Sequence, residues 1–62
     1  MNPGILRDQF IGTLKSARWL EKRLRQIIAN DEIRGDRRAR IKENADFVSM
    51  LVNDLEDELA IE

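Results

Sequence analysis

The stretch IKENADFVSMLVNDLEDEL, residues 41–59, contains the clearest pattern in the sequence. Its apolar residues recur at alternating intervals of four and three, which places them on one stripe of an α-helix. The residues of this stripe are Ile41, Ala45, Val48, Val52, Leu55 and Leu59. An earlier stripe has the same spacing and consists of Leu6, Phe10, Thr13, Ala17, Leu20, Leu24 and Ile27. Because such stripes have to be covered, the sequence predicts an all-α protein in which two helices form an antiparallel hairpin.

Local signals place the ends of the two helices. Asn2 and Pro3 favour a helix start, because proline is tolerated at the first helical position. Asn30, Gly35 and Asp36 favour a turn, since asparagine ends helices, glycine adopts positive φ and aspartate caps the next helix. We therefore expect one domain over residues 1–62, with a helix over about 3–30, a turn over about 31–36 and a helix over about 37–60.

The two stripes also predict a register. If facing residue numbers sum to 65, the layers are Leu6 with Leu59, Phe10 with Leu55, Thr13 with Val52, Ala17 with Val48, Leu20 with Ala45, and Leu24 with Ile41. Leu14, Ile28 and Leu51 widen the stripes beyond what one neighbour covers. A single seam between two short helices buries little apolar surface, and the free energy gained by this burial hardly offsets the entropy cost of ordering the chain. We therefore predict a homodimer of hairpins, which is a four-helix bundle.

Composition restricts the chemistry. The 62 residues include no cysteine and no histidine, which removes disulfides, thiolate ligands and the commonest general base. No apolar run approaches the roughly 20 residues that span a bilayer. We expect no enzymatic activity, no cofactor and no metal site, no association with a membrane, and a cytoplasmic location.

Charge is distributed unevenly along the chain. Residues 15–42 carry ten Lys or Arg against four Asp or Glu, a net charge of +6, whereas the remaining residues have a net charge of -7. In a hairpin this makes the turn end basic and the terminal end acidic. Two interpretations stay open: the segregation orients an antiparallel dimer, or the basic end binds an anionic partner.

A group of residues outside the stripes is the leading candidate site. Trp19 lies far from the apolar stripe of its helix and is surrounded by cations one turn away. An aromatic side chain among cations is typical of a protein-binding hot spot, although burial by a second hairpin is an alternative explanation. The predicted partner-binding residues are Trp19, Lys15, Lys22, Arg23, Phe47 and Met50.

The leading functional hypothesis is a small non-catalytic adaptor or inhibitor that binds another protein, of the kind found as a regulator in bacteria or phages. The alternative is nucleic-acid binding through the basic turn end, with phosphate contacts from Arg34, Arg37, Arg38 and Arg40. In length and predicted topology the chain resembles the plasmid-encoded Rop-type RNA-binding proteins, which are helical hairpins that dimerise into four-helix bundles. This resemblance implies an architecture and assigns no site residues.

Overall fold

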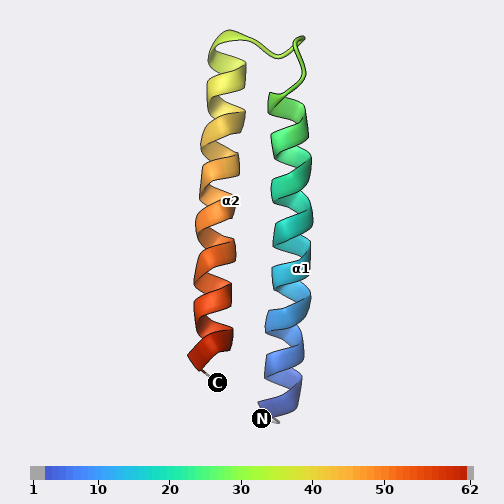
Figure 1. The fold of residues 1–62 in the computed structure, drawn as a ribbon, viewed down its shortest axis with the longest axis vertical. Coiled ribbons are helices and arrows are strands. Elements are labelled where there is room, and N and C mark those ends of the chain that lie inside the picture. Colours follow the sequence, from blue (N-terminus) through green and yellow to red (C-terminus); the bar gives the residue numbers. More distant parts are fainter. Residues whose placement is uncertain (1–2, 62) are drawn as a thin grey trace.

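The structure, a computed structural model, describes residues 3–61 and consists of two helices, α1 (Pro3–Ile28) and α2 (Gly35–Ile61). They run antiparallel, and the described ends of the chain lie together at the end opposite the turn (Figure 1). The molecule is a rod with principal extents of 46 × 15 × 14 Å. The predicted all-α hairpin is confirmed.

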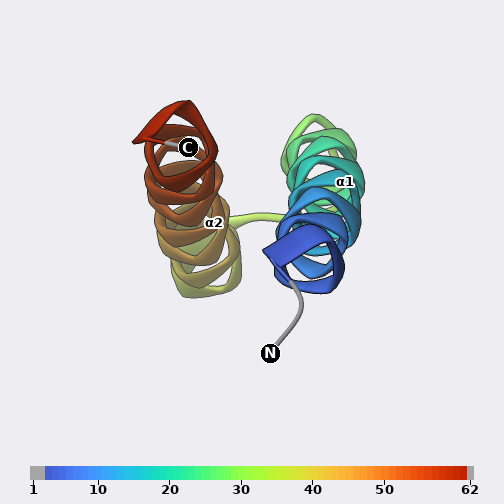
Figure 2. The same cartoon turned by 90° about the horizontal axis from the view of Figure 1, so that it is seen from below.

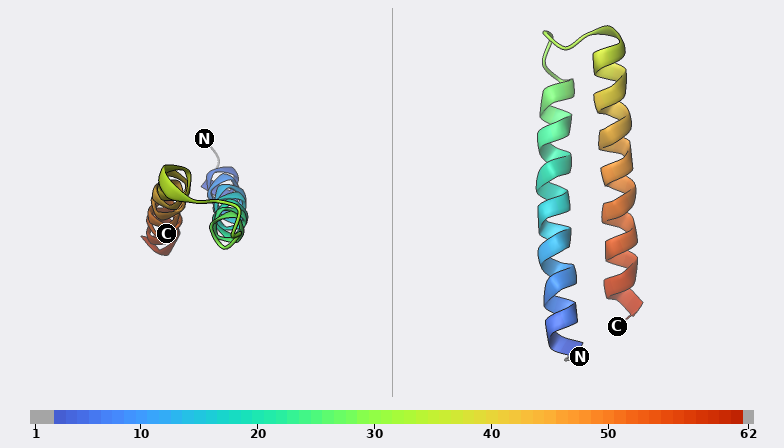
Figure 3. Two further views of the ribbon diagram at one scale, coloured as in Figure 1. Left: turned by 90° about the horizontal axis from the view of Figure 1, so that it is seen from above. Right: turned by 180° about the vertical axis from the view of Figure 1, so that it is seen from behind.

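The hairpin is a single layer of two helices. Views from below and from above show the helices next to one another with nothing above or beneath the pair (Figures 2 and 3). Within the described residues, each helix therefore has the other helix as its one neighbour. No helix within residues 3–61 is long and apolar enough to cross a membrane.

Helix α1 ends two residues earlier than predicted, and two backbone hydrogen bonds follow its last turn. The Ala29 amide donates to the Arg25 carbonyl at 3.1 Å, and the Asn30 amide donates to the Ile27 carbonyl at 3.0 Å. The second bond spans three residues rather than four, so it tightens the chain and closes the helix. The predicted end at residue 30 is therefore corrected to Ile28.

Asn30 and Gly35 shape the connection. The Asn30 side-chain oxygen accepts a hydrogen bond from the Glu32 amide at 2.9 Å, as in an Asx turn. Gly35 has a φ of 61°, the left-handed conformation that glycine adopts without steric cost. Because the helix begins at Gly35, Asp36 lies in its first turn instead of capping it as predicted. Asn2, the predicted start signal of α1, lies outside the described residues.

The core is small and centres on the middle of the hairpin. Leu14 is 7% exposed and packs with Val48 and Val52. Ala45 is also buried, and partly buried apolar residues surround the cluster: Ala17, Leu24, Leu55 and Leu59. The predicted stripe of α2 is confirmed, because each of its residues is buried or partly buried.

The predicted stripe of α1 is only partly correct. Four of its residues were expected to face α2 but are exposed: Leu6, Thr13, Leu20 and Ile27. Leu14 instead points into the seam. The predicted layer of Leu20 against Ala45 is therefore wrong. The physical reason is that a wide stripe does not specify which part of it meets a single neighbour.

Candidate functional site

The two long sides of the hairpin differ in chemistry. On one side, which we call the paired side, charged groups join the helices. Arg18 Nη2 lies 2.7 Å from Glu56 Oε1, and Arg25 Nη2 lies 3.2 Å from Asp46 Oδ1. These side chains are roughly half exposed, so each pair contributes on the order of 0–1 kcal/mol.

A hydroxyl group extends the network on the paired side. Ser49 Oγ accepts a hydrogen bond from Arg25 Nη2 at 3.0 Å and donates one to a carboxylate oxygen of Glu21. Glu21 and Ser49 are partly buried polar residues at the edge of the seam. Together with the two ion pairs, they make this side of the hairpin polar and link the two helices along it.

The opposite side, which we call the open side, is apolar. At about 100° per residue, Leu6, Leu20 and Ile27 of α1 fall on the flank of the seam away from the ion pairs, and so do Phe47 and Leu51 of α2. All five are exposed, from 38% for Leu6 to 55% for Phe47. Because neighbouring exposed apolar side chains mark an interaction surface more reliably than isolated ones, the open side is a candidate interface.

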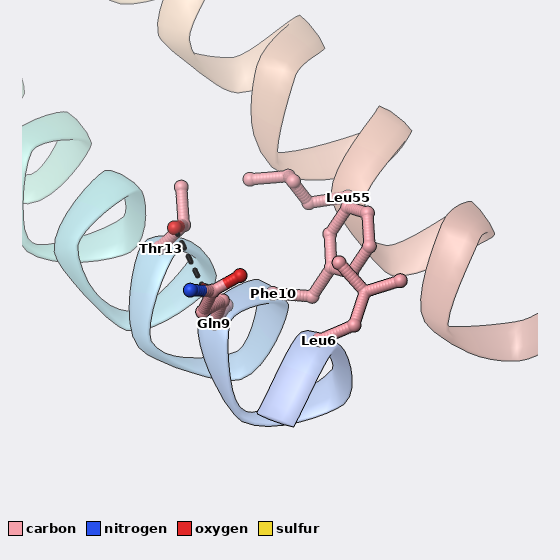
Figure 4. Close-up of a pocket in the computed structure, with 5 residues that line it drawn as sticks. All are labelled: Leu6, Gln9, Phe10, Thr13 and Leu55. Carbon is pink, nitrogen blue, oxygen red and sulfur yellow. Dashed lines mark hydrogen bonds between the residues drawn. The ribbon is translucent and has the colours of Figure 1, made fainter. Parts of the chain in front are cut away.

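A hollow lies at the edge of the open side, near the terminal end of the rod. Its walls are Leu6, Gln9, Phe10, Thr13 and Leu55 (Figure 4). Phe10 and Leu55 project towards one another from the two helices, which agrees with the predicted layer containing both. The Thr13 hydroxyl donates to the Gln9 carbonyl at 2.8 Å, so its polar group is satisfied by its own helix. The hollow is therefore mainly apolar.

Trp19 lies on a third surface, the back of α1, which points away from α2. Its side chain is 63% exposed, and the Arg23 guanidinium carbon lies 5.5 Å from the ring centroid, within range of a cation–π interaction. A shallow hollow beside the indole is lined by Lys15, Ser16, Trp19 and Leu20. We call Lys15, Trp19, Lys22 and Arg23 the Trp19 surface, since the helical spacing places all four on the back of α1.

The structure does not bring all six predicted partner-binding residues together. Met50 is 51% exposed on the back of α2 and points away from α1, so it lies across the hairpin from Trp19. Phe47 falls on the open side beside Leu51 rather than on the Trp19 surface. The predicted set therefore separates into four residues on α1, one on the open side and one on the back of α2.

The four arginines of the predicted nucleic-acid site lie at the turn end and are exposed. Arg34 Nε donates to the Asp31 carbonyl at 3.1 Å, so this arginine also stabilises the turn. Arg37, Arg38 and Arg40 are the other three, and their spacing spreads them over nearly half of the circumference of α2. Because of this spread, the three arginines do not form one flat basic face.

The sequence prediction missed the difference between the paired and open sides. A signal for it was present: Arg18 and Arg25 are seven residues apart on α1, and Ser49 and Glu56 are seven apart on α2. Residues seven apart lie on the same side of a helix, so these four residues define a polar flank on each helix.

Among residues 3–61, no three His, Cys, Asp or Glu side chains are grouped to hold a metal ion.

The chain was compared with protein-family models, with curated proteins and with solved structures, and none of these comparisons gave a match.

Proposed function

We propose that the protein is a cytoplasmic homodimer of hairpins, a four-helix bundle, that acts as an adaptor or inhibitor by binding another protein through the Trp19 surface. The observation that carries the proposal is the 63% exposure of Trp19 with Arg23 against its ring. A large exposed indole is unfavourable in water, and tryptophan and arginine are enriched among residues that dominate binding energy.

The charges around Trp19 indicate the kind of protein it binds. Lys15, Lys22 and Arg23 give the surface three positive charges, and no acidic residue belongs to it as defined above. A partner with an apolar pocket bordered by Asp or Glu would complement both features, because complementary charge steers association and suppresses wrong partners. We therefore propose an acidic, pocket-bearing protein as the partner.

The dimer is supported by the open side. A single hairpin leaves Leu20, Ile27 and Phe47 in water, although a second helical layer would bury them. The chain is also too short for a large core of its own, and oligomerisation is a common solution at this size. In such a dimer Trp19 and its three cations stay accessible, because they lie on the back of α1, outside the open side. Leu20, which lines the hollow beside the indole, becomes buried.

The test is partner capture followed by measured affinities. The tagged protein is used to capture a partner from host-cell extract, and the purified partner is then titrated with variants. Trp19→Ala should weaken binding by about 2 kcal/mol or more, roughly 30-fold, while helicity and dimer mass stay unchanged. Ile61→Ala, which removes an apolar side chain that is 79% exposed, is the matched control and should bind normally. Equal affinities for the two variants would contradict the proposal, and so would dissociation of the dimer by Trp19→Ala.

A second candidate function is nucleic-acid binding at the turn end. Its supporting observation is that Arg37, Arg38 and Arg40 are exposed and make no ion pair within residues 3–61, unlike Arg18 and Arg25. If these arginines contact phosphates, replacing all three with glutamine should abolish RNA or DNA binding. Each lost contact should also lower the salt dependence of the logarithm of the affinity by about 0.7–0.9 units of slope. Unchanged binding and slope would exclude this function for the turn end.

A further inference from the structure

From the residues along the open side we infer that a second copy of this chain docks there antiparallel, with α1 on α1 and α2 on α2, so that the two Trp19 side chains share one surface. This inference rests on the proposed dimer and specifies its interface and orientation. It requires the open side to be self-complementary, because in a two-fold dimer the same patch meets itself.

The open flank of α1 meets this requirement. Leu6, Thr13, Leu20 and Ile27 are spaced seven residues apart along it. A two-fold axis between residues 16 and 17 would place Leu6 against Ile27 of the second copy and Thr13 against Leu20 of the second copy. Each large side chain at the ends then meets another large one, and the central leucine meets a smaller threonine. The row can therefore pack against itself without a clash of two large central residues.

The open flank of α2 has the same property and adds charge. From the turn end to the terminal end, its residues are Arg37, Arg40, Asn44, Phe47, Leu51, Asp54 and Glu58. The order is basic, then amide and apolar, then acidic. An axis near residue 49 would place Phe47 against Leu51 of the second copy and Arg40 against Glu58 of the second copy. Apolar groups then meet apolar groups at the centre, and opposite charges meet at both edges.

The two axes have to coincide for one dimer to satisfy both helices. Leu14 packs between Val48 and Val52, which places it level with about residue 50 of α2. Counting along the antiparallel helices, the point between residues 16 and 17 is then level with the point between residues 47 and 48. This differs from residue 49 by about 1.5 residues, or roughly 2 Å, which is less than half of one helical turn. The two symmetric patterns therefore lie at nearly the same level along the rod.

The opposite orientation is unfavourable. If the turn ends of the two copies lay together, α1 would pack on α2 of the second copy, and Arg37 and Arg40 of both chains would lie at the same end of the interface. Like charges brought together at an interface oppose association. The antiparallel arrangement avoids this, and the 46 Å by 15 Å outline of the open side offers roughly 700 Å² per copy, close to the ~800 Å² of a standard interface.

This orientation has a consequence for the Trp19 surface. With α1 packed on α1, both indoles project from the same flank of the bundle, since each points away from its own α2. Trp19 lies near the axis at residues 16–17, so the two side chains are offset by about five residues, or roughly 8 Å, along the rod. The partner-binding surface is thus made by both copies and would be halved in a monomer.

The chain contains no cysteine, so a single introduced cysteine can be labelled or oxidised selectively. Asp31→Cys carries a spin label at the turn, and the distance between the two labels of the dimer is measured by pulsed electron paramagnetic resonance. The expected distance is close to the 46 Å length of the rod, because antiparallel copies place their turns at opposite ends. Ser16→Cys, near the axis, should form an intermolecular disulfide readily, since facing helices lie about 8–10 Å apart.

Matched variants test the choice of side. Leu20→Glu places a charge in the proposed interface and should raise the dimer dissociation constant at least about a hundredfold, because a buried unpaired charge is costly. Met50→Glu places the same charge on the back of α2 and should leave the dimer unchanged. A dimer that survives Leu20→Glu would overturn the assigned interface.

The remaining outcomes separate this inference from the proposed dimer itself. A dimeric mass with the two Asp31→Cys labels within about 20 Å, roughly two helix diameters, would overturn the antiparallel orientation but leave the dimer standing. A monomeric mass for the unmodified protein would overturn both. A long label distance without a Ser16→Cys disulfide would overturn the packing of α1 on α1.

Discussion

Gly35 is the residue through which the chain leaves the turn and enters α2. Its φ of 61° is accessible to glycine but costs an L-residue with a β-carbon roughly 1 kcal/mol, although no neighbouring atom obstructs a side chain there. Gly35→Ala should therefore lower the free energy of unfolding by about 1 kcal/mol, measured from the urea midpoint. Gly35→Asn should lose less, because asparagine tolerates this conformation. An unchanged midpoint for Gly35→Ala would show that the turn adopts another backbone in solution.

Single residues with specific local chemistry were predictable from the sequence. Asn30 and Gly35 were expected in the turn and both shape it, because their preferences depend on their own backbone geometry. The contact between Trp19 and Arg23 was also expected, since residues four apart are neighbours on a helix. Asp36 was predicted to cap α2 but lies in its first turn, because the helix begins at Gly35, one residue earlier.

At the scale of the helices, α2 was predicted more accurately than α1. The predicted stripe of α2 is the face that meets α1, and Ala45, Val48 and Val52 are buried as expected. On α1 the face that meets α2 is shifted towards Leu14, and Leu20 of the predicted stripe is exposed. Sequence periodicity gives the width of an apolar stripe but does not say which edge a neighbour covers.

The orientation of α1 can be tested through Leu14. Because its side chain is 7% exposed and packs in the central cluster, Leu14→Ala should reduce the free energy of unfolding by about 2 to 5 kcal/mol in chemical denaturation. Ile5→Ala, on the exposed back of the same helix, is the control and should change it by less than about 0.5 kcal/mol. Similar losses from the two variants would mean that a different face of α1 meets α2.

Helix-end electrostatics do not explain the stability of α2. Asp36 is well placed in its first turn, but Arg37 and Arg38 follow at the same positive end of the helix dipole, and the last turn contains no basic residue. The arrangement of charges along α2 therefore does not stabilise the isolated helix. In the proposed antiparallel dimer, the same arrangement places basic residues of one copy against acidic residues of the other.

At the scale of the whole molecule, the hairpin was predictable, because two stripes of matching length specify two antiparallel helices. The stripes describe one chain only, so they do not specify a partner for the open side. The candidate site shows the same limit. The sequence placed Trp19 among cations, but only the structure separated it from Met50. Trp19 is exposed on the side of α1 that faces away from α2, and Met50 is exposed on the side of α2 that faces away from α1.

We propose that the hairpin functions as a dimer that closes its open side. Sedimentation equilibrium at micromolar concentration, together with far-ultraviolet circular dichroism, measures the mass of the particle and its helicity in the same sample. We expect a particle of twice the 7.3 kDa chain mass that dissociates and loses helicity together on dilution. A 7.3 kDa particle that retains full helicity at these concentrations would contradict it.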